Sequence, residues 1–282
     1  MSGPKVFLDY DQKALDDAYD QAAYAANRDQ VIARFASASR ITRRQLGEPR
    51  RFSYGKSPTE GLDVYRSRKP DAPVNIFIHG GAWRAGLARD YAFPAEMFAR
   101  AGSHFVVLDF NNVLETGGDL MVMADQVRRA VAWVIDNARQ FGGDPDRVYV
   151  SGTSSGAHLG GVVAISGFAV QGYVLASGMY DLRAPRLSKR SSYVTFTDAV
   201  EDALSPQRHL SRISAPIVLL YGSLETPEFQ RQSHDFATAL QKAGKPVELI
   251  AAEGYNHFGL TETLGNPFGP LGRAVLKQMG LA

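Results

Sequence analysis

The feature of this sequence that most constrains its fold is an alternation of short apolar runs with amphipathic segments. The run at 74–78 (VNIFI) resembles a central strand of a parallel sheet, whose two faces are both covered. Further strands are expected at 104–109, 147–151, 172–176, 216–221 and 247–251, and helices at 91–101, 119–141, from 154, 228–243 and 270–279. Strands that alternate with helices predict an α/β fold: one mostly parallel, twisted sheet of about eight strands with helices on both faces.

Three segments depart from this alternation. Residues 12–38 have the spacing of an amphipathic helix with a break near Asn27, so 1–50 is expected to be a helical N-terminal arm. Residues 51–66 read as two antiparallel strands around a Ser-Pro turn. The segment 183–212 has no clear periodicity and is expected to insert above the sheet as a cap or loop. The whole chain, 1–282, is therefore predicted to be a single domain.

A serine motif lies between a predicted strand and a predicted helix. Residues 152–156 (GTSSG) match G-x-S-x-G, which in this context lifts a serine hydroxyl above the edge of a sheet. The chain has no cysteine, so a covalent nucleophile has to be an oxygen or an amine. We therefore expect Ser154 to be the nucleophile and the backbone N–H of Ser155 to bind a developing oxyanion.

A second glycine motif follows the first central strand. The segment 79–83 (HGGAW) places Gly80 and Gly81 where backbone N–H groups can turn toward a substrate oxygen without side chains in the way. Together with Ser155, these two glycines are the predicted oxyanion hole. His79 is expected to support the loop rather than to act as a base.

The base and the acid are expected on loops after the last two strands. His257, in the segment GYNHF, can reach over the nucleophile, whereas His158 lies one turn beyond Ser154 on the same helix and is expected to be structural. Glu225, just beyond the strand at 216–221, can orient the imidazole of His257. Asp181 and Glu228 remain alternatives for this acid.

The sequence resembles α/β-hydrolases of the arylformamidase (kynurenine formamidase) and hormone-sensitive-lipase-like esterase group. The resemblance extends over about 9–276, and it rests on HGGAW (79–83), FGGDPDRVYVSGTSSGAHLGG (141–161), SGMYDL (177–182), YGSLETPEFQRQS (221–233) and GYNHF (254–258). The order Ser154, Glu225, His257 along the chain is the order found in that fold. Two departures are Glu225 where aspartate is usual, and GTSSG where a histidine often precedes the serine and an alanine follows it.

The resemblance implies a serine hydrolase that cleaves a small ester or an activated amide of the aryl formamide type through an acyl-enzyme. A general carboxylesterase, a specialised catabolic amide hydrolase and, more remotely, a non-catalytic binding protein of the same fold are the alternatives. An aromatic leaving group would need an aromatic slot, and the candidates for its lining are Trp83, Phe110, Tyr180, Tyr255 and Phe258.

Composition and motifs exclude several other classes. With 31 basic and 29 acidic side chains, the chain lacks the charge of a nucleic-acid-binding protein. No apolar run is long enough for a transmembrane helix, and the N-terminus does not read as a secretory signal, so a cytoplasmic location is expected. Dinucleotide, P-loop and metal-binding motifs are missing, so we expect no cofactor and no metal. The expected partner is a small-molecule substrate, and a homodimer is compatible with the sequence.

Overall fold

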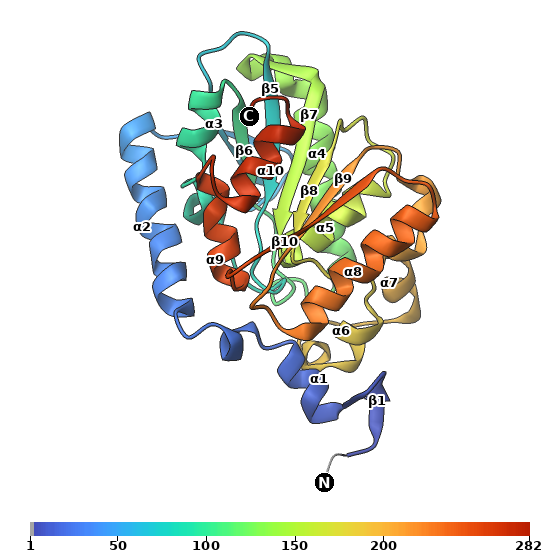
Figure 1. Cartoon of the computed structure of the whole chain (residues 1–282). Coiled ribbons are helices and arrows are strands. Elements are labelled where there is room, and N and C mark those ends of the chain that lie inside the picture. Colours follow the sequence, from blue (N-terminus) through green and yellow to red (C-terminus); the bar gives the residue numbers. More distant parts are fainter. Residues whose placement is uncertain (1–2) are drawn as a thin grey trace.

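The computed structural model describes residues 3–282 and contains, within that range, one eight-stranded sheet (Figure 1). The strand order is β10-β9-β8-β7-β5-β6-β4-β3. β4 runs antiparallel to both β3 and β6, and all other neighbours are parallel. The strands are β3 (Arg50–Ser53), β4 (Gly61–Tyr65), β5 (Ala72–Ile78), β6 (His104–Leu108), β7 (Gly143–Thr153), β8 (Tyr173–Ala176), β9 (Ile217–Gly222) and β10 (Val247–Ala252). The predicted α/β fold with a mostly parallel sheet is confirmed.

The two faces of the sheet bury separate hydrophobic cores. Along β5, Ile76 and Ile78 point into one core and Phe77 into the other, as the two-residue period of a strand requires. The first core is closed by α4 (Leu120–Asn137), α5 (Ser155–Ala164) and α8 (Pro227–Lys242). The second is closed by α3 (Ala95–Ala101), α9 (His257–Glu262) and α10 (Pro270–Gln278). Short 3-10 helices η2 (Ala88–Tyr91), η3 (Ala138–Phe141) and η7 (Thr263–Gly265) complete these layers.

The N-terminal arm is more divided than the sequence pattern predicts. A hairpin of β1 (Lys5–Phe7) and β2 (Tyr10–Asp11) precedes α1 (Gln12–Ala18), η1 (Gln21–Tyr24) and α2 (Arg28–Leu46). The additional break follows α1, where the Asp20 side chain accepts a hydrogen bond from Ala22 N at 3.1 Å and so competes with helix continuation. Met1 and Ser2, the first two residues of the expected arm, lie outside the described residues. The arm runs along the molecule, and α2 packs against α9 (Figure 1).

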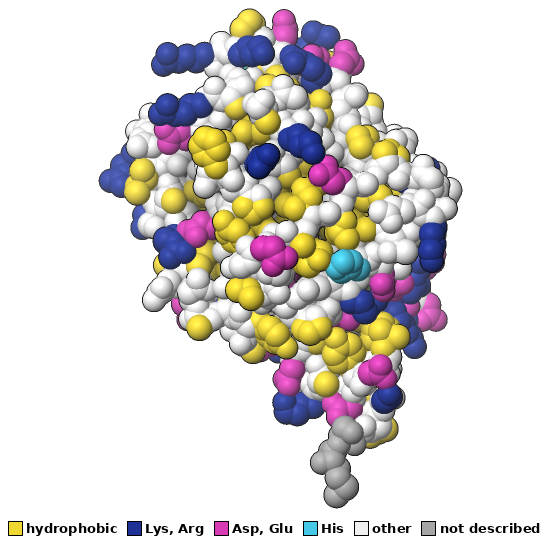
Figure 2. All heavy atoms as spheres, viewed as in Figure 1, with side chains coloured by type: hydrophobic (Ala, Val, Ile, Leu, Met, Phe, Trp, Pro, Cys, Tyr) yellow, Lys and Arg dark blue, Asp and Glu magenta, His cyan; other side chains and the backbone are white. Residues whose placement is uncertain are grey.

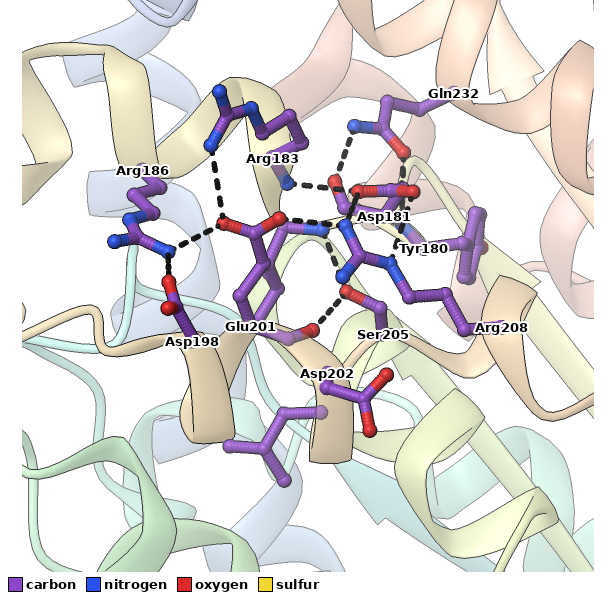
Figure 3. Close-up of polar contacts among 12 residues, drawn as sticks. Tyr180, Asp181, Arg183, Arg186, Asp198, Glu201, Asp202, Ser205, Arg208 and Gln232 are labelled. Carbon is purple, nitrogen blue, oxygen red and sulfur yellow. Dashed lines mark hydrogen bonds and ion pairs between the residues drawn. The ribbon is translucent and has the colours of Figure 1, made fainter.

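The segment 183–212 consists of short helices that a periodicity search cannot detect. They are α6 (Arg183–Leu187), η4 (Lys189–Ser192), α7 (Asp198–Ala203), η5 (Pro206–Arg208) and η6 (Leu210–Arg212). A cluster of ion pairs around the buried Glu201 joins α6, α7 and η5 (Figure 3). Glu201 accepts hydrogen bonds from Arg208 at 2.7 Å and Arg186 at 3.0 Å, and Arg208 also reaches Asp181 at 3.0 Å.

The surface shows no concentration of one charge on the face seen in Figure 1. Figure 2 shows lysine and arginine interspersed with aspartate and glutamate around that face, and hydrophobic side chains across its middle. Between residues 3 and 282, no helix combines the length and the apolar composition needed to cross a bilayer.

We expect Glu201→Gln to destabilise the fold, because it leaves Arg208 and Arg186 without their shared carboxylate. The guanidinium groups are partly exposed, so the expected loss is about 1–2 kcal/mol in the free energy of unfolding, measured in urea. The matched control is Asp198→Asn, whose carboxylate also pairs with Arg186 but is 94% exposed, and no measurable change is expected there.

The same variant carries a pH signature. Burial raises the pKa of Glu201, but the hydrogen bonds from Arg208 and Arg186 outweigh burial and leave the pKa below the usual 4.5. A depressed pKa in the folded state means that the carboxylate stabilises the fold above about pH 4.5 and loses this contribution as the pH falls below it. The stability difference between the unmodified chain and Glu201→Gln should therefore shrink below about pH 4.5, and a constant difference would contradict the ion-pair account.

Candidate active site

Ser154 occupies a sharp turn between β7 and α5. Its backbone has φ 57° and ψ −126°, a conformation that non-glycine residues rarely adopt. The turn is held by a hydrogen bond of 2.8 Å from Ser154 N to Ala176 O, at the end of the neighbouring strand β8. The Ser154 side chain is half-buried at the carboxyl edge of the parallel strands. The strand-turn-helix context predicted from G-x-S-x-G is thus present.

Close backbone approach around this turn requires glycine at two positions. A Cβ atom on Gly156 would lie 2.0 Å from Ile78 O, so α5 can start directly beneath β5 only without a side chain there. A Cβ atom on Gly80 would lie 3.1 Å from Ser154 Cβ and 2.9 Å from Thr153 O. The loop after β5 therefore lies directly against Ser154.

The N–H groups predicted to bind an oxyanion are free. Among the described residues, the amides of Gly80, Gly81 and Ser155 donate no hydrogen bond to a protein group. The loop that carries the glycines is fixed by His79, whose ring stacks on Phe110 at 4.5 Å and on Tyr91 at 5.2 Å, and whose Nδ1 donates to Gly80 O at 2.9 Å. Rigid, unpaired N–H donors are what stabilise a developing negative charge on a substrate oxygen.

His257 and Glu225 meet at the ends of β10 and β9. His257 Nδ1 lies 3.1 Å from Glu225 Oε2, and both side chains are buried. Glu225 Oε1 accepts hydrogen bonds from Gly222 N at 2.8 Å and from Ser177 Oγ at 2.5 Å. Gln21, on the N-terminal arm, donates to Oε2 at 3.4 Å. A carboxylate held in this way orients an imidazole so that its Nε2 can accept a proton.

Ser177 and Gln21 are members of this cluster that sequence reasoning missed. Ser177 directly follows β8, the strand beside the one that leads into Ser154, and this position at the sheet edge is the signal that points to it. Gln21 contacts Glu225 across more than 200 residues of sequence and has no local signal.

The base and the nucleophile are not hydrogen-bonded to each other in this structure. Within residues 3–282, neither Ser154 Oγ nor His257 Nε2 has a hydrogen-bond partner, and neither is among the orphaned buried atoms. Ser154 connects to this cluster through Ala176, which accepts from Ser154 N and precedes Ser177. Hydrogen bonds of this kind are often long in ligand-free enzymes and tighten when substrate binds.

The two other candidate acids have other partners. Asp181 accepts from Arg208 at 3.0 Å and lies in the ion-pair cluster of Figure 3. Glu228 accepts two hydrogen bonds from Arg231, at 2.7 and 2.6 Å, and a third from Tyr19 Oη at 3.0 Å. Of the three carboxylates, Glu225 is the one that contacts His257.

His158 is locked in the interior. Its Nε2 donates to Leu204 O at 2.8 Å, so its Nδ1 is unprotonated and accepts from Trp83 Nε1 at 3.1 Å. Burial lowers the pKa of His158 to about 4, which keeps the ring neutral. In residues 3–282, no three His, Asp or Glu side chains are grouped so that they could hold a metal ion.

The five aromatic residues expected to line a substrate slot fall into different environments. Phe258 is half-buried with its ring edge-on to His257 at 5.3 Å. Tyr255, two residues before His257, is also half-buried. Phe110 and Trp83 are buried against His79 and His158. The expectation for Tyr180 is wrong, because it is 0% exposed and stacks on Phe236 at 4.4 Å in the hydrophobic core.

The N-terminal arm holds the loops that carry the acid and the base. Thr226 Oγ1, next to Glu225, donates to Ala18 O at 2.7 Å. Asn256, next to His257, donates to Asn27 Oδ1 at 2.8 Å. Arg34 forms two hydrogen bonds of 2.6 and 2.8 Å with Glu262 at the end of α9. The arm therefore contributes to the geometry of the site, as well as covering the sheet.

The chain is similar in sequence to known esterases and formamidases. The family model described as BD-FAE matches residues 62–177. The kynurenine formamidase of Danio rerio is 30% identical over 241 residues, 80% of each chain, and that of Salmo salar is 31% identical over 246 residues, again 80% of each. An isoprenylcysteine alpha-carbonyl methylesterase of Arabidopsis thaliana is 27% identical over 75% of this chain and 56% of its own.

Solved structures share the fold at lower sequence identity. A crystal structure from Silicibacter sp. tm1040 has a TM-score of 0.81 at 22% identity, covering 91% of this chain and 97% of that chain. The esterase of Pyrobaculum calidifontis has a TM-score of 0.70 at 20% identity, covering 96% and 98%.

We expect Ser177→Ala to weaken the alignment of Glu225 with His257, because it removes one of the donors to the buried carboxylate. A hydrogen bond to a charged group is worth about 1.5–3 kcal/mol, and a partial loss of this in the transition state predicts a 5- to 50-fold lower kcat with little change in KM. Steady-state hydrolysis of a p-nitrophenyl ester measures both constants. The control is Ser192→Ala, an exposed serine whose hydroxyl bonds only to Lys189 O. A change in KM alone would contradict the positioning role.

Proposed function

This chain belongs to the kynurenine formamidase family of α/β-hydrolases, and on that basis we propose that it hydrolyses aryl formamides with Ser154, His257 and Glu225 as its catalytic triad. Its similarity to formamidases and esterases supports a serine hydrolase that acts on esters or amides. The observation that carries the triad is the 3.1 Å contact between His257 Nδ1 and Glu225 Oε2 at the sheet edge that also carries the strained Ser154.

The reaction starts with proton transfer. Glu225 holds the imidazole of His257 with its proton on Nδ1, so that Nε2 takes the proton of the Ser154 hydroxyl as the oxygen attacks the substrate carbonyl carbon. The carbonyl oxygen becomes an oxyanion and is bound by the free N–H groups of Gly80, Gly81 and Ser155. Since the loop is already fixed by His79, these donors do not have to reorganise during the step.

The acyl-enzyme then forms and is hydrolysed. His257 gives its proton to the leaving amine nitrogen as the C–N bond breaks, and the acyl group remains on Ser154 Oγ. A water molecule gives a proton to His257 and attacks the acyl carbon. As the second tetrahedral intermediate collapses, the bond to Ser154 Oγ breaks, His257 returns the proton to that oxygen, and formate is released.

The choice of a formamide rests on coverage. The two formamidases match over 80% of their own length, whereas the Arabidopsis methylesterase and the esterase LipQ of Mycobacterium tuberculosis match over 56% and 55% of theirs. A general esterase is the second candidate, because LipQ is also 30% identical to this chain.

Substrate comparison separates the two candidates. We expect turnover of N-formylkynurenine with a kcat/KM at least tenfold above that of p-nitrophenyl acetate, and Ser154→Ala should lower kcat on both by at least about 10⁴-fold with the fold intact. Circular dichroism of the variant checks the fold, and a fluorophosphonate should label the unmodified chain but not the variant. Faster hydrolysis of the ester than of the formamide favours the general esterase. Turnover retained in Ser154→Ala would contradict the triad assignment. No labelling of Ser154 would favour a non-catalytic binding protein.

Substitution of the three carboxylates tests the assignment of the acid. Glu225→Gln keeps the shape of the side chain but no longer fixes the imidazole tautomer, and a loss of about 10³-fold in kcat is expected by analogy with other triads. Asp181→Asn and Glu228→Gln, matched charge-to-amide changes near the same sheet edge, should cost less than tenfold in the folded protein. A larger loss in either of these two than in Glu225→Gln would reassign the acid.

A further inference from the structure

Arg190 is an unusual cation in this protein. Among the described residues it is the one lysine or arginine that is buried, with 6% of its surface exposed. It lies in η4, in the segment above the sheet. An arginine stays charged at any ordinary pH, so its burial has to be compensated by neighbouring groups.

Two aromatic rings flank the guanidinium. Its central carbon lies 5.3 Å from the ring centre of Tyr19 and 5.3 Å from that of Trp83. Such cation–π contacts stabilise a charge but leave the edge of the guanidinium plane free to form hydrogen bonds. Nη1 donates to Tyr193 Oη at 2.8 Å, and Nε is buried without any partner. Nη2 has no hydrogen bond and is not among the orphaned buried atoms, so it reaches accessible space.

Within the described part of the chain, Arg190 has no carboxylate partner. In residues 3–282 no carboxylate oxygen lies within ion-pair distance of Arg190: Glu228 pairs with Arg231, Glu201 with Arg186 and Arg208, and Asp20 with Lys189. A buried guanidinium with an orphaned N–H and no counter-charge is a costly arrangement for the free protein. The accessible Nη2 is therefore a preformed donor for an anion such as a carboxylate, because a charge-assisted hydrogen bond to a guanidinium is strong.

The position of Arg190 links it to both sides of the active site. Trp83, whose ring contacts the guanidinium, is two residues after Gly81 of the oxyanion loop. Tyr19, the second ring beside the guanidinium, contacts the ring of Phe229 at 5.7 Å, and Phe229 contacts the ring of His257 at 5.1 Å. A continuous series of side chains thus leads from the loop beside Ser154, through Arg190, to the base.

We propose that Arg190 anchors a carboxylate of the substrate through its accessible Nη2, beside Tyr19 and Trp83. This inference rests on the proposed function in one respect: formamide hydrolysis decides which part of the substrate carries the carboxylate. A formyl group has no substituent, so the carboxylate belongs to the arylamine that leaves. Arg190 is therefore assigned as the specificity-determining residue for the acidic end of the leaving group.

Kinetics on a matched pair of substrates test the anchor. The pair is N-formylkynurenine and its analogue with hydrogen in place of the carboxylate, and the quantity measured is the ratio of their kcat/KM values. Arg190→Met, which keeps an unbranched side chain for packing, should lower this preference by about 10- to 100-fold, mainly through KM of the acid. Arg190→Lys should restore part of it. The matched control is Arg84→Met, an exposed arginine whose guanidinium lies 4.8 Å from the Tyr193 ring, and its preference should stay within twofold.

An equal loss on both substrates in Arg190→Met would overturn the anchor and indicate a structural role. An unchanged preference would overturn it as well. If Arg190→Met does not fold, inhibition of p-nitrophenyl acetate hydrolysis by kynurenine in the unmodified chain replaces it: inhibition has to be competitive and at least tenfold stronger than by decarboxylated kynurenine, and equal inhibition by the two overturns the proposal.

A binding measurement separates this proposal from the proposed function. Calorimetric titration of kynurenine into Ser154→Ala, and into the same chain with Arg190→Met added, needs no turnover. Weaker binding by at least tenfold in the double variant supports the anchor even if formamides are not hydrolysed, in which case only the proposed reaction fails. Equal binding overturns the anchor even if formamides are hydrolysed.

Discussion

The constraint on which the rest of the site depends is the strained turn at Ser154. A non-glycine residue at φ 57° and ψ −126° costs of order 1–3 kcal/mol, and the surrounding structure has to hold it there. The restraint comes from the hydrogen bond to Ala176 O on one side and the close approach of β5 to Gly156 on the other. Because β5, β7 and β8 are adjacent parallel strands, the sheet itself keeps these three points together. The strain is compensated by the most buried part of the fold.

The other groups of the site are carried on loops, which need their own support. Glu225 and His257 follow β9 and β10 at the open side of the sheet, where fewer strands surround them. The N-terminal arm supplies the missing support through Ala18, Asn27 and Arg34. Contacts between residues this far apart in sequence are costly in loop entropy, so they are stable only because the arm also buries Leu15 and Val31.

The sequence could predict those features that depend on local pattern. The alternation of strands and helices predicted the sheet, and the strand-turn-helix context predicted the elbow at Ser154. Short helices such as α6 and α7 were not predicted, because five or six residues are too few to show the repeating apolar pattern of an amphipathic helix. Ser177, Gln21 and Arg190 were not predicted either, because their contacts are with residues far away in the sequence. Tyr180 was wrongly expected in a slot because a residue after a strand end can turn either to the surface or to the core, and packing against Phe236 decides for the core.

Charge pairing gives a different view of the site from net charge. A net charge of +2 implies little long-range steering of a charged substrate. Inside the protein, however, the buried carboxylates Glu228 and Glu201 are paired with arginines, and Glu225 is hydrogen-bonded to His257. Arg190 is the buried cation of residues 3–282 without such a match. Recognition of an anionic group in this molecule would therefore come from one short-range contact with a largely buried guanidinium, where a charge is screened less than at the surface, and would depend little on the ionic strength of the solution.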